Sequence, residues 1–102
     1  KSLINNLEYF KKELSAGIPI KKIILFGSQV KGTTHKWSDI DLIIVSPKFR
    51  RKVSYKRSRG FYKFWKLNYP VDFLCYTPEE FNKLKKQITI VREAVREGIE
   101  IK

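Results

Sequence analysis

The stretch IILFGSQVKGTTHKWSDIDLIIV, residues 23–45, decides the fold of this chain. Two short apolar runs, Ile23–Phe26 and Ile40–Val45, stand at its ends, and a polar segment joins them. Short apolar runs that are rich in β-branched residues and bounded by turn residues indicate buried strands. A third run of this kind, Val71–Tyr76, follows later in the chain. We therefore expect a small mixed β-sheet built from these three strands.

Helices are expected before, between and after these strands. In the first segment, apolar residues recur every three or four positions, which predicts a helix over Ser2–Ser15. Thr77 suits the N-cap of a later helix because Glu80 stands three residues after it, and this helix is expected to cover Pro78–Gly98. A further helix is expected over roughly Val53–Leu67.

The elements together predict an α/β (α+β) fold in which helices flank the sheet. Its length of 102 residues suits a single domain over 1–102. Ile99 and Ile101 alternate with Glu100, which is compatible with a short final strand or a frayed end.

The charge of the chain favours acidic partners. Lys and Arg number 22 against 10 Asp and Glu, for a net charge of +12. Such a balance favours nucleotides, nucleic acid, an acidic protein or an anionic surface. The single cysteine, Cys75, excludes an internal disulfide. No signal peptide is recognisable, and no apolar run approaches the roughly 20 residues of a membrane span, so we expect a cytoplasmic protein without membrane attachment.

Three aspartates stand out against apolar surroundings. Residues two apart on a strand point to the same side, so Asp39 and Asp41 should face one way. Asp72 lies in the next apolar strand, and all three converge if the two strands are neighbours. Converging carboxylates repel one another, and a divalent cation such as Mg²⁺ or Mn²⁺ relieves that repulsion. The alternative is a turn at Asp39 and a paired surface acid at Asp41.

Gly27 and Ser28 follow directly on the first strand. Glycine lets the backbone turn sharply and approach an anion closely, and the serine hydroxyl with nearby N–H groups can hold phosphate oxygens. Taken alone, this pair is also what an ordinary turn looks like.

The order of these features resembles a known family. Leu25-Phe26-Gly27-Ser28 followed by Ser38-Asp39-Ile40-Asp41-Leu42 is similar to the signature of the DNA polymerase β nucleotidyltransferase superfamily. The small size resembles its minimal nucleotidyltransferase branch. The resemblance implies a polymerase β palm-like fold. It also implies transfer of a nucleoside monophosphate, AMP from ATP, to a hydroxyl acceptor by two-metal chemistry.

The resemblance also implies residue roles. Gly27 and Ser28 would hold the β- and γ-phosphates of the nucleoside triphosphate, with Lys31 and Ser38 as further nucleotide-binding residues. The catalytic and metal-ligating residues would be the carboxylates Asp39, Asp41 and Asp72. In the minimal branch the acceptor is often a side chain of a partner protein, which implies a HEPN-domain partner in a toxin–antitoxin pair.

One departure from the family leaves an alternative function open. Relatives often carry Arg in the loop after Gly-Ser, whereas this chain has Gln29-Val30-Lys31. Lysine supplies charge but not the bidentate fork of arginine. The alternative is a catalytically weak nucleotide- or nucleic-acid-binding module that acts through partner binding.

The segment Lys48–Lys66 is strongly basic. It contains nine Lys and Arg residues interleaved with aromatic ones, and no acid occurs between Leu42 and Val71. Cations interleaved with aromatic rings are typical of surfaces that bind single-stranded nucleic acid. An acidic protein partner and a solvated face with inward-packed aromatics are the alternatives.

Overall fold

The computed structural model describes residues 2–27, 40–53, 56–67 and 69–102. Four strands form one sheet in the order β3-β2-β1-β4. Their bounds are β1, Lys22–Phe26; β2, Ile40–Val45; β3, Val71–Tyr76; and β4, Ile99–Glu100. β1 runs antiparallel to β2 and β4, whereas β2 and β3 are parallel. The sheet is therefore mixed, as the sequence predicts, and β4 adds a fourth strand at one edge.

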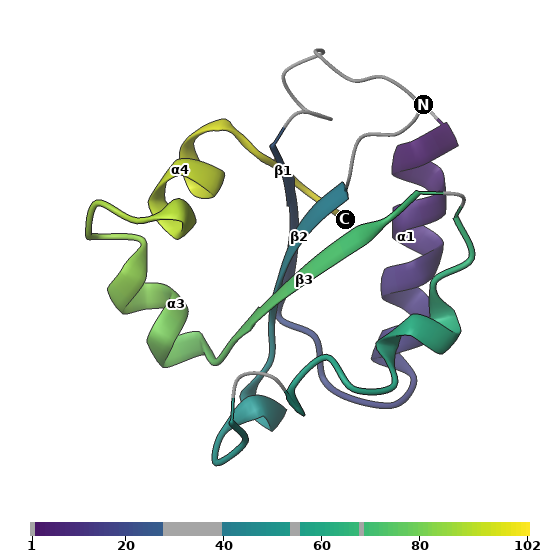
Figure 1. The fold of residues 1–102 in the computed structure, drawn as a ribbon, viewed down its shortest axis with the longest axis horizontal. Coiled ribbons are helices and arrows are strands. Elements are labelled where there is room, and N and C mark those ends of the chain that lie inside the picture. Colours follow the sequence, from purple (N-terminus) through teal and green to yellow (C-terminus); the bar gives the residue numbers. More distant parts are fainter. Residues whose placement is uncertain (1, 28–39, 54–55, 68) are drawn as a thin grey trace.

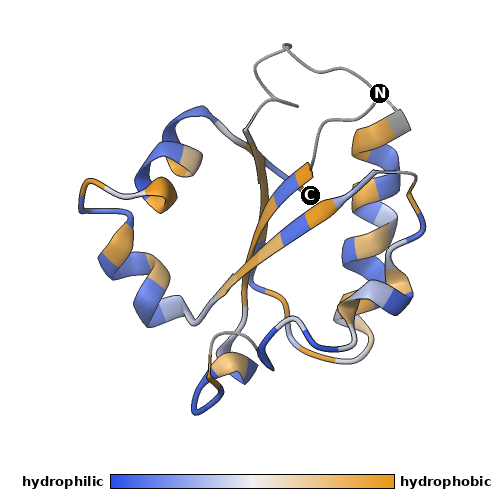
Figure 2. Ribbon diagram, in the orientation of Figure 1, coloured by the Kyte–Doolittle hydropathy of each residue, from blue (hydrophilic) through white to orange (hydrophobic). Residues whose placement is uncertain are grey.

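Helices cover both faces of this sheet. α1 (Ser2–Ser15) lies against one face, and α3 (Pro78–Leu84) and α4 (Ile90–Glu97) lie on the other (Figure 1). Alternation along β2 divides its side chains between two cores: Leu42 and Ile44 pack on the α1 side, and Ile43 and Val45 on the α3/α4 side. Figure 2 shows central strands that are mainly hydrophobic, with hydrophilic segments near the starts of β2 and β3.

Two helix predictions are wrong, and each failure has a local cause. In place of an α-helix, the described residues of Val53–Leu67 contain the 3₁₀ helix η3 (Phe61–Phe64), preceded by Lys56 in a 3₁₀ conformation and by turns over 57–60. Gly60 begins η3 with φ +89°, a left-handed conformation that an α-helix cannot contain. Three aromatic residues of this segment, Phe61, Phe64 and Trp65, pack on the core. The rings of Trp65 and Phe10 meet edge to face, with 5.2 Å between ring centres.

The predicted helix Pro78–Gly98 is divided in two. Its start is correct, because Thr77 and Glu80 form a reciprocal capping box. The chain leaves the helix after Leu84, and Thr89 begins α4 by accepting a hydrogen bond from the Arg92 N–H. The interruption leaves Ile88, which lies inside the predicted helix, 93% exposed.

Two further features complete the fold. Another 3₁₀ helix, η1 (Pro47–Phe49), follows β2 and buries Phe49. Among the described residues, no helix has the length and apolar character needed to cross a membrane.

Candidate active site

Two of the three candidate aspartates lie side by side on the sheet. β2 and β3 are parallel and paired so that Asp41 stands directly opposite Asp72. Paired residues of adjacent strands point to the same face, and neighbouring strands are about 4.8 Å apart. The structure thus confirms that the two strands are neighbours, which the sequence left conditional.

The end of β1 borders the same spot. Phe26, the last residue of β1, is paired with Asp41 across the antiparallel ladder. Phe26, Asp41 and Asp72 therefore form a row across three strands on one face, at the end of the sheet where β1 stops and β2 and β3 begin (Figure 1). The chain leaves this row at Gly27.

Gly27 is fitted to the carboxylate of Asp41. Its φ of +89° lies in the left-handed region, which residues with a side chain rarely adopt. A Cβ atom at Gly27 would stand 2.6 Å from Oδ2 of Asp41. Any larger residue would have to displace that oxygen, so the glycine sets where the carboxylate can lie.

The aspartates lie where the helix layer on their face leaves the sheet accessible. On the same face, Ile43 and Val45 further along β2 are buried in the core with Phe81 of α3 and Val91 of α4. Asp41 is partly buried and Asp72 is exposed. A ligand can therefore approach the carboxylates from solvent while the rest of the strands stays packed.

The other predicted site residues lie outside the described residues. These are the phosphate-binding and nucleotide-binding residues Ser28, Lys31 and Ser38 and the carboxylate Asp39. Within the described ranges, no three His, Cys, Asp or Glu side chains group closely enough to hold a metal ion. The structure thus places Asp41 beside Asp72, and the catalytic and metal-binding roles of all three carboxylates stay predictions.

Part of the basic segment has a structural task that the sequence did not reveal. The guanidinium of Arg57 forms two hydrogen bonds to the Glu80 carboxylate, one of them at 3.0 Å, and another to the carbonyl oxygen of Cys75 at 3.1 Å. Arg57 Nε also donates to the Lys52 carbonyl oxygen at 3.0 Å. One side chain therefore ties the segment after β2 to the end of β3 and the start of α3.

These contacts shift the ionisation of both partners. Hydrogen bonding to Glu80 raises the pKa of Arg57, and hydrogen bonding from Arg57 lowers the pKa of Glu80. A second ion pair, Arg50–Glu79, lies on the surface nearby. One feature of the sequence could have indicated these pairs. Two acids, Glu79 and Glu80, begin a helix just after a basic segment that contains no acid of its own.

Cys75 does not belong to the chemistry of the site. Burial raises the pKa of its thiol to about 12. The thiol therefore stays protonated at neutral pH and is a poor nucleophile and metal ligand.

Comparison with known proteins agrees with this geometry. Residues 7–96 match the nucleotidyltransferase domain family, so the chain belongs to that family. No protein with a curated description matches the chain. The fold is similar to the crystal structure, at 1.40 Å resolution, of a Sulfolobus solfataricus protein classed as a nucleotidyltransferase. The two chains are 17% identical with a TM-score of 0.66, and the match covers 95% of this chain and 77% of the other.

Family and fold together confirm the prediction of a minimal nucleotidyltransferase. At 17% identity the structural likeness concerns the fold, and the family match supports nucleotidyl transfer in general. The nucleotide, the metal and the acceptor are separate questions.

Proposed function

We propose that this protein transfers a nucleoside monophosphate, AMP from ATP, to a hydroxyl acceptor. The observation that carries the proposal is the register of the parallel strands, which sets Asp41 beside Asp72 at an accessible end of the sheet. These two residues and Asp39 are all the aspartates in the chain. The chain has no other aspartate, and two of the three are paired across neighbouring strands. A binding site explains this arrangement better than scattered surface acids do.

The donor set fits Mg²⁺ or Mn²⁺. Asp41 and Asp72 are paired on neighbouring strands, whose backbones lie about 4.8 Å apart, and a cation between their carboxylates would relieve the repulsion of the two charges. Hard divalent cations take carboxylate oxygens and complete their shells with water and substrate phosphate. Asp41 and Asp72 would hold the ions, with Asp39 as the third carboxylate.

Ions held by Asp41, Asp72 and Asp39 would supply positive charge to the phosphate oxygens during an in-line displacement at phosphorus. The residues of the chain supply position. Gly27 keeps the backbone clear of the Asp41 carboxylate, and Ser28 would contact the terminal phosphates. Lys31 and Ser38 would add contacts to the nucleotide. Asp72, the most exposed of the described site residues, would receive the acceptor hydroxyl and take its proton.

The reaction balances without an added reactant. The acceptor oxygen forms a bond to the α-phosphorus of ATP, and the bond from that phosphorus to the bridging oxygen breaks. Pyrophosphate leaves with the electron pair of that bond, and the hydroxyl proton passes to the carboxylate. All three charged phosphates of ATP must be held during this step, which a chain of net charge +12 favours.

We further propose that the acceptor is carried by a HEPN-domain protein, with this chain as the antitoxin of the pair. A surface that could receive a protein lies around α4. Four large aliphatic side chains are exposed there, namely Ile88, Ile90, Val95 and Ile99. Exposed apolar side chains gathered in one region mark protein contacts more often than solvent-facing surface.

The test is transfer of label from ATP that is radiolabelled at the α-phosphate. The protein is incubated with Mg²⁺ and a candidate HEPN-domain partner, and labelled partner is separated from free nucleotide. We expect label on the partner with the wild type, none with Asp72→Asn, and full transfer with Glu8→Gln, a matched loss of one exposed carboxylate on α1, on the other face of the sheet. Transfer by Asp72→Asn at the wild-type rate would contradict the assignment. If the complex forms and masks the partner without label, the protein acts by binding alone.

A further inference from the structure

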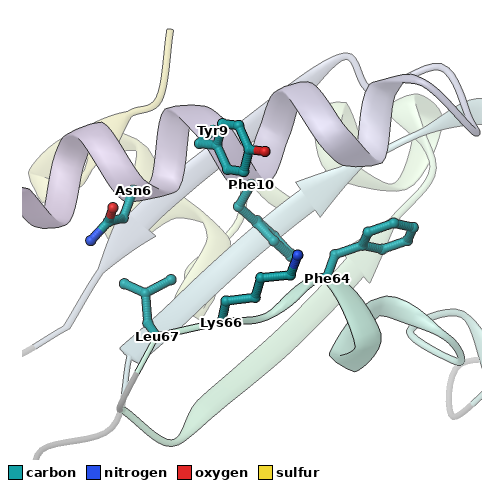
Figure 3. A pocket seen from close by; sticks show the side chains of 6 residues that line it. All are labelled: Asn6, Tyr9, Phe10, Phe64, Lys66 and Leu67. Atoms are coloured by element: carbon teal, nitrogen blue, oxygen red, sulfur yellow. The ribbon is translucent and has the colours of Figure 1, made fainter.

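A shallow groove lies between α1 and the chain that follows η3. It has a volume of about 100 Å³ and is lined by six residues, Asn6, Tyr9, Phe10, Phe64, Lys66 and Leu67. Figure 3 shows Asn6 and Tyr9 on the helix on one side, and Lys66 extending along the opposite side between Leu67 and Phe64. The groove lies on the α1 face of the sheet, whereas Asp41 and Asp72 belong to the α3/α4 face.

Two of the three aromatic side chains of this groove, Tyr9 and Phe64, reach the surface. Tyr9 is 59% exposed although it neighbours Phe10, which is buried in the core. Phe64 is partly buried and carries the ammonium of Lys63 over its ring at 5.3 Å from the ring centre. A flat ligand can therefore reach the exposed ring of Tyr9 without disturbing the core beneath it, with Phe64 at the edge of the same groove.

The charge around the groove has one sign on the η3 side. Lys63 and Lys66 are exposed, and residues 43–70 contain no acid. Arg50 and Arg57 of the same segment are held by carboxylates of α3, so the positive charge near the groove comes from other side chains. On α1, the acid Glu13 stands four residues, or about one helical turn, after Tyr9.

We propose that this groove binds single-stranded nucleic acid. A base would stack on Tyr9 or Phe64, the ammonium groups of Lys63 and Lys66 would contact the flanking phosphates, and Asn6 would reach a base edge. Stacking on aromatic rings combined with cations along the backbone is how proteins hold single strands without strong sequence preference. The site is separate from the aspartates and does not rest on the proposed catalysis.

The test is fluorescence anisotropy with a labelled oligoadenylate of about twelve nucleotides, a length within the usual range for single-strand sites. RNA and DNA forms of the probe show which sugar is preferred. We expect Tyr9→Ala to weaken binding about tenfold, and Tyr9→Phe, which keeps the ring, to bind like the wild type. Because Tyr9 is largely exposed, both variants should fold as the wild type does, and thermal melting checks their stability.

A charge-matched pair separates the groove from the overall charge. Lys66→Gln should reduce the slope of log Kd against log salt concentration by about 0.7, the value for one phosphate of a single strand. Lys86→Gln removes the same charge from the turn after α3 and should leave both affinity and slope close to the wild type.

Three outcomes would overturn the proposal. Equal losses for Lys66→Gln and Lys86→Gln would mean that only the net charge attracts the probe. Binding by Tyr9→Ala at the wild-type affinity would remove stacking. Displacement of the probe by polyglutamate as readily as by unlabelled oligoadenylate would indicate a surface for acidic proteins. Asp41→Asn should bind the probe normally, so failure of the groove and failure of the catalytic site are distinguishable.

Discussion

Replacing Gly27 by Ala tests how the strand end shapes the candidate site. The substitution has two separable consequences. An L-residue at φ +89° costs about 1–2 kcal/mol of folding stability, because its Cβ crowds the backbone in the left-handed region. The new Cβ would also meet Oδ2 of Asp41 at 2.6 Å. That oxygen ends a rotatable side chain, so we expect it to turn away at little cost in stability but to lose its position for a ligand.

Gly60→Ala is the matched control. Gly60 has the same φ of +89°, and a Cβ there would meet no atom within 4 Å. Both variants should therefore unfold at lower temperature by similar amounts, about 4–8 °C for each kcal/mol in a domain of this size. Only Gly27→Ala should lose affinity for Mg²⁺–ATP.

Thermal melting and calorimetric titration of Mg²⁺–ATP measure the two consequences separately. If Gly27→Ala and Gly60→Ala are equally stable and both bind nucleotide as the wild type does, the carboxylate position is not set by Gly27. If Gly27→Ala is far less stable than Gly60→Ala, the contact with Asp41 belongs to the packing of the fold.

The remaining predictions concern the contacts of α3 and the lone thiol. Arg57→Ala should lower the free energy of unfolding by about 2 kcal/mol in urea titrations, because it removes several hydrogen bonds of a guanidinium that is only 9% exposed. Arg50→Ala, which breaks an exposed ion pair, should have a much smaller effect. Since Arg57 holds the folded-state pKa of Glu80 below its ordinary value of 4.5, the stabilisation by this pair is complete above about pH 4.5 and is lost as the pH falls through the lower folded-state pKa. Glu80→Gln should therefore flatten the dependence of stability on pH in this acidic range, and an unchanged profile would refute the linkage. Cys75 should react with a thiol reagent at pH 8 only as fast as the protein unfolds, because burial raises its pKa to about 12; rapid labelling of the native protein would contradict this.

The strands were predictable because their signals are local. β2 and β3 have the bounds that the sequence predicts, and β1 begins one residue earlier, at Lys22. Each run is apolar, β-branched and closed by residues that favour turns, so local preference and burial agree. The first helix was predictable for the same reason, since its stripe is regular and Leu7, Phe10 and Leu14 pack in the core on one face of the sheet.

The two wrong helices show where local signals stop. Apolar residues recur with a helical period at Leu84, Ile88, Val91 and Val95. Within this stretch, however, Thr89 is better suited to an N-cap than to a helix interior, and a new helix begins there. In the basic segment, Phe61 and Trp65 suggested an amphipathic helix, but their rings reach the core from a 3₁₀ turn. Because protein cores are close-packed, an apolar side chain is buried only where it fits the space that the other side chains leave. The spacing of apolar residues in the sequence does not reveal that space.

The candidate site was partly predictable from residue types and spacing. The sequence indicated Asp41 and Asp72 as a pair only if their strands were neighbours, and the parallel register settles that condition. The close approach of Gly27 to Asp41, where an added Cβ would lie 2.6 Å from Oδ2, could not be predicted. It depends on how the end of β1 is placed against the start of β2. Nor could the ties of Arg57 to β3 and α3, which join residues far apart in the sequence.

The most direct test of the central claim is calorimetric titration of ATP into the protein with Mg²⁺ present. We predict binding by the wild type that disappears when the metal is chelated and in both Asp41→Asn and Asp72→Asn, while Glu93→Gln binds normally. Binding that persists without metal or without these carboxylates would contradict the proposal that the paired aspartates hold the metal and its nucleotide.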